Sequence, residues 1–222
     1  LGGIFFLFVG GGTLRRRALS VAGGAALPLL ALAAYNLAST GHLFNPAYEY
    51  LYRYEVDAYS VLGYRAAWSI EDIRYIPQNL AIMLLQPPNL RLECLAELGA
   101  ASFFDHDCPV LAPDAVGMSL LLTSPAYLLV IPAIRRRSVD PVVAGGLAAT
   151  LLIATLNLMH FSQGWVQFGY RFSLDFAPFL LPVVALGLDS LTGRGRVAAY
   201  VLIGISMAVT LWGVVWRSIL GW

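Results

Sequence analysis

The stretch VVAGGLAATLLIATLNLMH, residues 142–160, contains no Asp, Glu, Lys or Arg. A run of about 20 apolar residues has the length that a helix needs to cross the hydrocarbon core of a bilayer. The sequence therefore predicts a membrane-spanning helix here, and similar runs occur on both sides of it.

The composition of the whole chain supports a lipid environment. Charged residues make up 12% of the 222 residues and apolar residues 59%, whereas soluble domains average about 25% and about 45–50%. A soluble domain of this length cannot bury so much apolar surface, so we expect membrane lipids around it. The net charge of +1 provides no concentrated basic face, and we expect no nucleic-acid partner.

Apolar runs long enough to span a bilayer recur along the chain. They lie at 18–37, 116–134, 142–160, 172–191 and 197–219, and residues 1–12 look like the last turns of a truncated helix. We therefore expect an all-α polytopic membrane protein with about five full transmembrane helices plus a truncated one. In this interpretation residues 1–222 are a single membrane domain, the C-terminal part of a longer chain.

The arginines indicate an orientation. They cluster at 15–17, at 135–137 and at 194–196, and two apolar runs separate each cluster from the next. All three clusters then lie on one face, which the positive-inside rule makes cytoplasmic. We expect a multi-pass protein of the bacterial plasma membrane, with residues 39–113 and 161–171 outside the cytoplasm.

The outer loop 39–113 is too long for a simple connection, and we expect it to bear short helices. In its tyrosine-rich opening, Asn45 and Pro46 favour a helix start, whereas the alternating tyrosines from Tyr48 to Tyr54 also fit a strand. Further on, Pro77 begins an apolar stripe that is too short to span, which favours an interfacial or re-entrant helix.

Cys94 and Cys108 are the only cysteines, and both lie in this outer loop. An oxidising compartment permits a disulfide bond between them, which would contribute about 3 kcal/mol in the chain-entropy model. Two unrelated free thiols are the alternative.

The densest polar cluster is FFDHDCP, residues 103–109. Its Asp-x-Asp pattern makes Asp105 and Asp107 candidate catalytic carboxylates, or ligands of a divalent cation such as Mg²⁺, Mn²⁺ or Ca²⁺. An ordinary solvated loop explains the same residues. His42 and His160 have no partner at metal-ligand spacing, so we expect no metal at either.

A second polar group lies in GWVQFGYRFSLDFAPFLLP, residues 164–182, where Arg171 and Asp175 stand at the mouth of an apolar run. One interpretation is an interfacial arginine that snorkels beside an i, i+4 partner. The other is a binding site, because a guanidinium suits phosphate bidentately. The substrate-binding candidates are Arg171, Tyr170, Gln167 and Trp165.

Three phrases together resemble a known family. They are YNLASTGHLFNPAY, PDAVGMSLLLTSPAYLLVIPAIRRR and GWVQFGYRFSLDFAPFLLPVVALG, and they are similar to the C-terminal portion of bacterial GT-C-type, mannosyltransferase-like membrane glycosyltransferases. The resemblance runs from about residue 35 to residue 188. It implies many helices, large outer loops and a polyprenyl-phosphate sugar donor.

The resemblance supplies no catalytic residue, because the family places its catalytic Asp or Glu in a first outer loop near the N-terminus. Only the turn 169–171 is carried over, as a donor-side contact. The implied reaction inverts the anomeric carbon: a carboxylate deprotonates the acceptor, and Arg171 stabilises the departing phosphate. The alternatives are a transporter or flippase subunit, which would need charges at mid-bilayer, and a non-catalytic scaffold.

Overall fold

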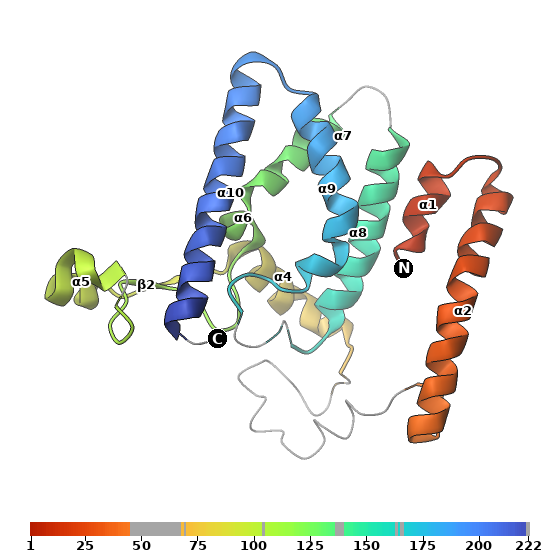
Figure 1. Cartoon of the computed structure of the whole chain (residues 1–222), viewed down its shortest axis with the longest axis horizontal. Coiled ribbons are helices and arrows are strands. Elements are labelled where there is room, and N and C mark those ends of the chain that lie inside the picture. Colours follow the sequence, from red (N-terminus) through yellow and green to blue (C-terminus); the bar gives the residue numbers. More distant parts are fainter. Residues whose placement is uncertain are drawn as a thin grey trace.

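The computed structural model describes residues 1–44, 68, 70–103, 105–135, 140–162, 164 and 167–220. Within these ranges the chain is mostly helical, and its longer helices lie side by side (Figure 1). This agrees with the expected all-α class. The tyrosine-rich stretch 45–67, with its open choice between helix and strand, lies outside the described residues.

The secondary structure follows a simple order along the chain. The helices are α1 (Gly3–Val9), α2 (Leu14–Thr40), α4 (Ile76–Leu85), α5 (Leu92–Leu98), α6 (Leu120–Thr123), α7 (Val130–Ile134), α8 (Pro141–Met159), α9 (Ser173–Asp189) and α10 (Gly193–Leu220). The 3₁₀ turns among the described residues are η2 (Ile73–Tyr75), η3 (Gly99–Phe103) and η4 (Pro125–Leu129). Two short strands, β1 (Asn89–Leu90) and β2 (Leu111–Ala112), pair antiparallel.

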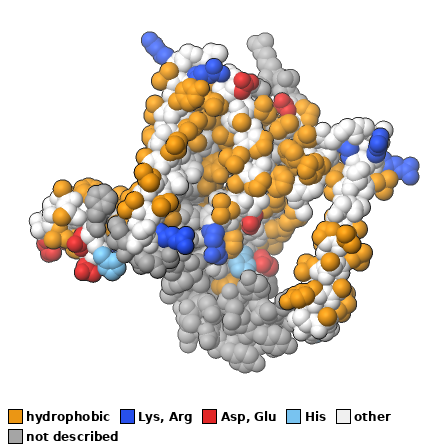
Figure 2. Space-filling model, viewed as in Figure 1, with side chains coloured by type: hydrophobic (Ala, Val, Ile, Leu, Met, Phe, Trp, Pro, Cys, Tyr) orange, Lys and Arg blue, Asp and Glu red, His pale blue; other side chains and the backbone are white. Residues whose placement is uncertain are grey.

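Among the described residues, three helices are long and apolar enough to cross a membrane. They cover Leu14–Thr40, Pro141–Met159 and Gly193–Ser218. Large apolar side chains such as Leu27 and Met207 stand exposed along α2 and α10, and Figure 2 shows hydrophobic side chains along the helices and basic ones near their ends. So extensive an apolar surface needs a covering, and these helices together indicate a membrane protein.

The run 116–134 does not form the single spanning helix that its composition predicts. The residue before a proline is driven out of the helical region, and Ser124, which precedes Pro125, has φ −144° and ψ 68°. The run is therefore divided into α6, η4 and α7, and its longest apolar helical piece is Pro125–Ile134.

Two further expected helices are shorter than predicted. The run 172–191 forms α9, which has 17 residues and contains Pro178 and Pro182, at the short end of the range for helices that cross the hydrocarbon core. Residues 1–12 contain only the seven-residue α1. The expectation of about five full spans is therefore not confirmed, since three helices meet the length and hydropathy of a span.

Glycines let the central helices approach closely. An added Cβ at Gly146 of α8 would lie 2.6 Å from the carbonyl oxygen of Phe179 in α9. A Cβ at Gly187 of α9 would overlap the carbonyl oxygen of Leu129. The contact between α9 and the η4–α7 segment therefore depends on a residue without a side chain.

The short helix α4 is bonded to the C-terminal end of α8. The Asn79 side-chain amide donates hydrogen bonds to the carbonyl oxygens of Leu158 and His160, at 2.9 and 2.7 Å. The backbone N–H of Asp72 donates to the carbonyl oxygen of Met159 at 2.8 Å. These bonds satisfy carbonyl groups that the end of a helix leaves unpaired, so the segment 70–85 is fixed to the bundle.

Residues 89–112 form a separate small unit, here called the arm. It consists of the β1–β2 pair, α5 and η3, and a disulfide bond joins Cys94 to Cys108 with their Cα atoms 5.3 Å apart. The buried residues of the arm include Cys94, Ser102 and Val110. With so small a core, the arm is braced covalently by the disulfide.

Replacing both cysteines of the arm with serine is expected to loosen α5. The disulfide closes a loop with a sequence separation of 14, and the loss of about 3 kcal/mol corresponds to an about hundredfold decrease in amide-exchange protection. Hydrogen exchange of residues 92–98 measures this change. Recovery of both thiols in alkylated form from unreduced protein would contradict the disulfide itself.

Candidate functional site

The turn between α8 and α9 is held by one buried amide side chain. Gln167 is 6% exposed, and its Nε2 donates to the carbonyl oxygen of Val116 at 2.7 Å. Its Oε1 accepts from the backbone N–H of Arg171 at 3.2 Å. Gln167, expected as a substrate contact, therefore fixes the turn against residues 115–117.

Two glycines make room for this amide. Gly117 and Gly164 have φ values of +100° and +108°, in the left-handed region that favours glycine. An added Cβ would lie 2.8 Å from Gln167 Nε2 at Gly117 and 2.6 Å from Oε1 at Gly164. The conformation of the turn, and with it the position of Arg171, rests on these three residues.

Arg171 follows the fixed turn with an exposed side chain. Its guanidinium carbon lies 5.7 Å from the ring centroid of Phe172. Asp175 accepts a hydrogen bond from the Asn157 side-chain amide at 2.9 Å, and no ion pair joins Asp175 to Arg171 in the part of the chain that the structure describes. The i, i+4 partnership expected for a snorkelling arginine is therefore not formed.

A cavity of about 540 Å³ opens beside this turn. It lies between α6 and η4, the start of α9 and the C-terminal half of α10, and it has the size of a small-molecule site. Its lining residues are Leu120, Thr123, Ser124, Tyr127, Gln167, Phe168, Gly169, Tyr170, Arg171, Ser173, Leu174, Thr210, Gly213, Val214 and Arg217. Two guanidinium groups thus share a cavity with hydroxyl groups and apolar walls.

Tyr170 is a lining residue of this cavity with a buried side chain. The residue is 2% exposed, and its hydroxyl has no hydrogen-bond partner among the described residues. Burial, together with the nearby Asp175 carboxylate, raises the pKa of the phenol above its usual value, so the hydroxyl keeps its proton at neutral pH. A buried donor without a partner is costly, which makes the Tyr170 hydroxyl a candidate ligand contact.

Replacing Tyr170 with phenylalanine separates a ligand role from a structural one. Without ligand, stability is expected to stay within about 1 kcal/mol of the wild type, because the lost hydroxyl makes no bond. Binding of a phosphate ligand is expected to weaken about tenfold, as one hydrogen bond to a charged group is lost. Thermal unfolding and ligand titration in detergent measure both. Unchanged affinity would exclude the hydroxyl from the site.

Two other predicted site residues, Asp105 and Asp107, do not line this cavity. Trp165 lies outside the described residues. Asp105 accepts hydrogen bonds from the backbone N–H groups of Asp107 and Cys108, at 2.9 and 2.8 Å, and so stabilises a local turn in the arm. Asp107 contacts His106 at 3.0 Å, and no three His, Cys, Asp or Glu residues converge on a metal position within the described ranges.

Two features of this end of the molecule were not predicted. Arg217 reaches the cavity from the last turn of α10; an arginine near the end of an apolar run, on the same side as Arg171, was the available signal. His160, expected to stand alone, has its Nδ1 2.8 Å from Glu71 Oε1. The two residues are 89 positions apart, so no local sequence pattern could have predicted this contact.

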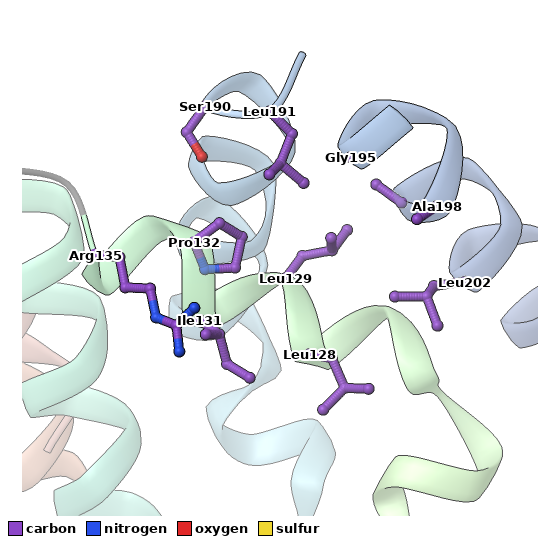
Figure 3. Close-up of a pocket in the computed structure, with 11 residues that line it drawn as sticks. Leu128, Leu129, Ile131, Pro132, Arg135, Ser190, Leu191, Gly195, Ala198 and Leu202 are labelled. Carbon is purple, nitrogen blue, oxygen red and sulfur yellow. The ribbon is translucent and has the colours of Figure 1, made fainter. Parts of the chain in front are cut away.

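A second cavity, of about 620 Å³, lies at the opposite end of α10. Figure 3 shows it between the η4–α7 segment, the end of α9 and the start of α10, with mostly aliphatic side chains directed into it. Arg135 is the one charged residue in its described lining. This cavity offers fewer polar contacts than the first, which is therefore the better candidate for an anionic ligand.

Comparison of the chain with known proteins returns no matching family model, no similar curated protein and no similar solved structure. The geometry of the first cavity is therefore the basis for a functional assignment.

Proposed function

We propose that this chain is part of a bacterial membrane glycosyltransferase that takes a sugar from a polyprenyl-phosphate donor and transfers it to an acceptor outside the cytoplasm. One observation carries the proposal. The 540 Å³ cavity brings together Arg171, Arg217 and Tyr170, a residue with a buried and unpartnered hydroxyl, at one end of the spanning helices. This combination suits a phosphate held at the depth of lipid head groups.

The orientation of the chain supports an outward-facing cavity. In Figure 1 the start of α2, the end of α7 and the start of α10 lie at the same end of the molecule. Each carries arginines at or next to its terminus, and the positive-inside rule assigns such an end to the cytoplasm. The cavity, lined by residues 210–217 from the other end of α10, then faces outward in a multi-pass plasma-membrane protein.

Two single cysteines test this orientation. Ile73→Cys is expected to react with a membrane-impermeant thiol reagent in intact cells, whereas Arg135→Cys is expected to react only after the cells are opened. Both side chains are exposed, so differences in burial do not decide the result. Labelling of Arg135→Cys alone in intact cells would reverse the assignment.

The walls of the cavity suit the other parts of such a donor. Leu120, Leu174 and Val214 provide apolar surface for the first prenyl units, and Phe168 provides a flat face for a sugar ring. In the proposed reaction Arg171 stabilises the phosphate as negative charge develops on it. Since the described lining contains no Asp or Glu, no general base is assigned to it.

Photo-crosslinking of the purified full chain tests the proposal. A polyprenyl phosphate carrying a photoreactive group in its first prenyl unit is expected to label peptides from η4, the start of α9 and the end of α10. Unlabelled polyprenyl phosphate is expected to compete, while the uncharged polyprenol of equal length is not. Equal competition by the phosphate and the alcohol would show that the cavity binds apolar lipid without recognising phosphate. Absence of labelling there would overturn the proposal and favour a scaffold.

A further inference from the structure

The arm stands apart from the helices that surround the cavity. Figure 1 shows α5 and the β1–β2 region projecting sideways beside α10. Helix α5 packs chiefly against η3 within the same arm. Yet the arm exposes large apolar side chains: Leu90 of β1 and Leu92 of α5 are 62% and 61% exposed. An apolar surface held out on a braced projection indicates a contact with something other than the bundle.

Helix α5 has two chemically different sides. At 3.6 residues per turn, Leu92, Leu95 and Leu98 fall within an arc of about 120°, and Glu93 and Glu97 point the opposite way. Cys94 lies between the two sides and is buried, tying the helix to Cys108. The disulfide thus fixes which side of α5 faces which direction.

The base of the arm lies at the depth of a membrane interface. Pro88 and Leu111 line a cavity of about 360 Å³ together with Val209 and Trp212 of α10. Trp212 is half-buried and lies toward the C-terminal end of the span Gly193–Ser218, where indole groups mark the boundary between lipid and water. The arm therefore leaves the bundle at this boundary.

The charged and the apolar side chains of the arm lie on opposite edges, along the direction of the spans. Figure 2 shows its acidic side chains and its histidine on the edge turned away from the arginine-rich end, and hydrophobic side chains on the edge toward the spans. The acidic residues of the arm are Glu93, Glu97, Asp105 and Asp107, and the Asp107 side chain is 96% exposed. Lipid on one edge and water on the other match this distribution.

We propose that the arm lies on the surface of the bilayer, with Leu92, Leu95 and Leu98 in the boundary between head groups and acyl chains. The occupant of the apolar surface is the lipid leaflet beside α10. Amphipathic helices bind in this way, with one side in lipid and the polar side in water. The carboxylates on the outer edge keep that edge hydrated. This inference does not depend on the proposed donor site.

Spin labels in phosphatidylcholine nanodiscs test the placement. Nitroxide labels on Leu92→Cys and Glu97→Cys of the full chain occupy opposite sides of α5, and a label on Ile205→Cys, exposed near the middle of the span in α10, serves as the lipid reference. Peptide mapping first verifies that Cys94 and Cys108 remain joined. Collision rates with oxygen, which concentrates in lipid, and with a water-soluble nickel chelate are then compared.

The label at position 92 is expected to favour oxygen, as does the label at 205, and the label at 97 is expected to favour the nickel chelate by several-fold. Equal exposure of 92 and 97 to the nickel chelate would place the arm in water and overturn the inference. Shielding of position 92 from both reagents would indicate a covering protein or a second copy of the chain, and would also overturn it.

Discussion

Replacing Arg171 with lysine is expected to weaken polyprenyl-phosphate binding about tenfold, since one hydrogen bond to a charged group is lost. Lysine keeps the positive charge but cannot present two parallel N–H groups to one phosphate. An interfacial anchor would tolerate the change, because lysine snorkels as well as arginine. Native mass spectrometry of lipid retention, or competition for the photo-crosslink, measures the effect.

Arg91→Lys is the matched control for this change. Arg91 is also an exposed arginine, but it lies in the arm and does not line the 540 Å³ cavity. It should leave binding unchanged, while expression and thermal unfolding stay normal in both variants. Wild-type affinity in Arg171→Lys would leave Arg171 as an anchor and remove the donor-site proposal.

Replacing Gly187 with alanine is expected to cost about 3 kcal/mol, the upper part of the range for overpacking a core. The new methyl group would overlap the carbonyl oxygen of Leu129, with Ala133 N close behind it at 3.5 Å. Because the obstacle is backbone, no side-chain rotation relieves it, and α9 must move away from the η4–α7 segment. Thermal unfolding in detergent, followed by size-exclusion chromatography, measures the loss of folded protein.

Gly204→Ala provides the comparison within the same bundle. Nothing lies within 4 Å of a Cβ added at Gly204 in α10, so the change carries only the helix-propensity gain of about 0.5–1 kcal/mol. The two glycine variants should therefore shift the unfolding temperature in opposite directions. Equal shifts would show that α9 and η4 are not closely packed in solution.

The sequence predicted the spans wherever one uninterrupted apolar run could form a helix by itself. Helix α8 begins at Pro141, one residue before the predicted 142, and ends at Met159 against the predicted 160. Helix α4 also appears as the expected short segment, from Ile76 to Leu85. Such elements depend on local hydropathy and length, which can be determined from a window of about 20 residues.

The division of the run 116–134 could have been anticipated in part. Hydropathy treats Pro125 and Pro132 as ordinary apolar positions, whereas backbone geometry does not. Where the helix resumes after such a break depends on packing, here against Gly187 of α9. Composition alone therefore does not predict this division of the run.

The sequence predicted only the part of the candidate site that comes from one short stretch of the chain. Tyr170 and Arg171 belong to the short turn that the sequence singled out, and both line the cavity. The opposite wall comes from α10, where Arg217 lies 46 positions further along the chain. The structural role of Gln167 was also hidden, because its partner Val116 is 51 positions away.

The hydrogen bonds between α4 and the end of α8 can form only late in translation. Asn79 precedes its acceptors Leu158 and His160 by 79 and 81 residues. At about 5–20 residues per second, α4 is made ~4–16 s before those carbonyl groups exist. During that interval α4, though already translated, has no α8 to bind. The segment 70–85 is therefore synthesised early, but it can be held in place only after the last turn of α8 has been translated.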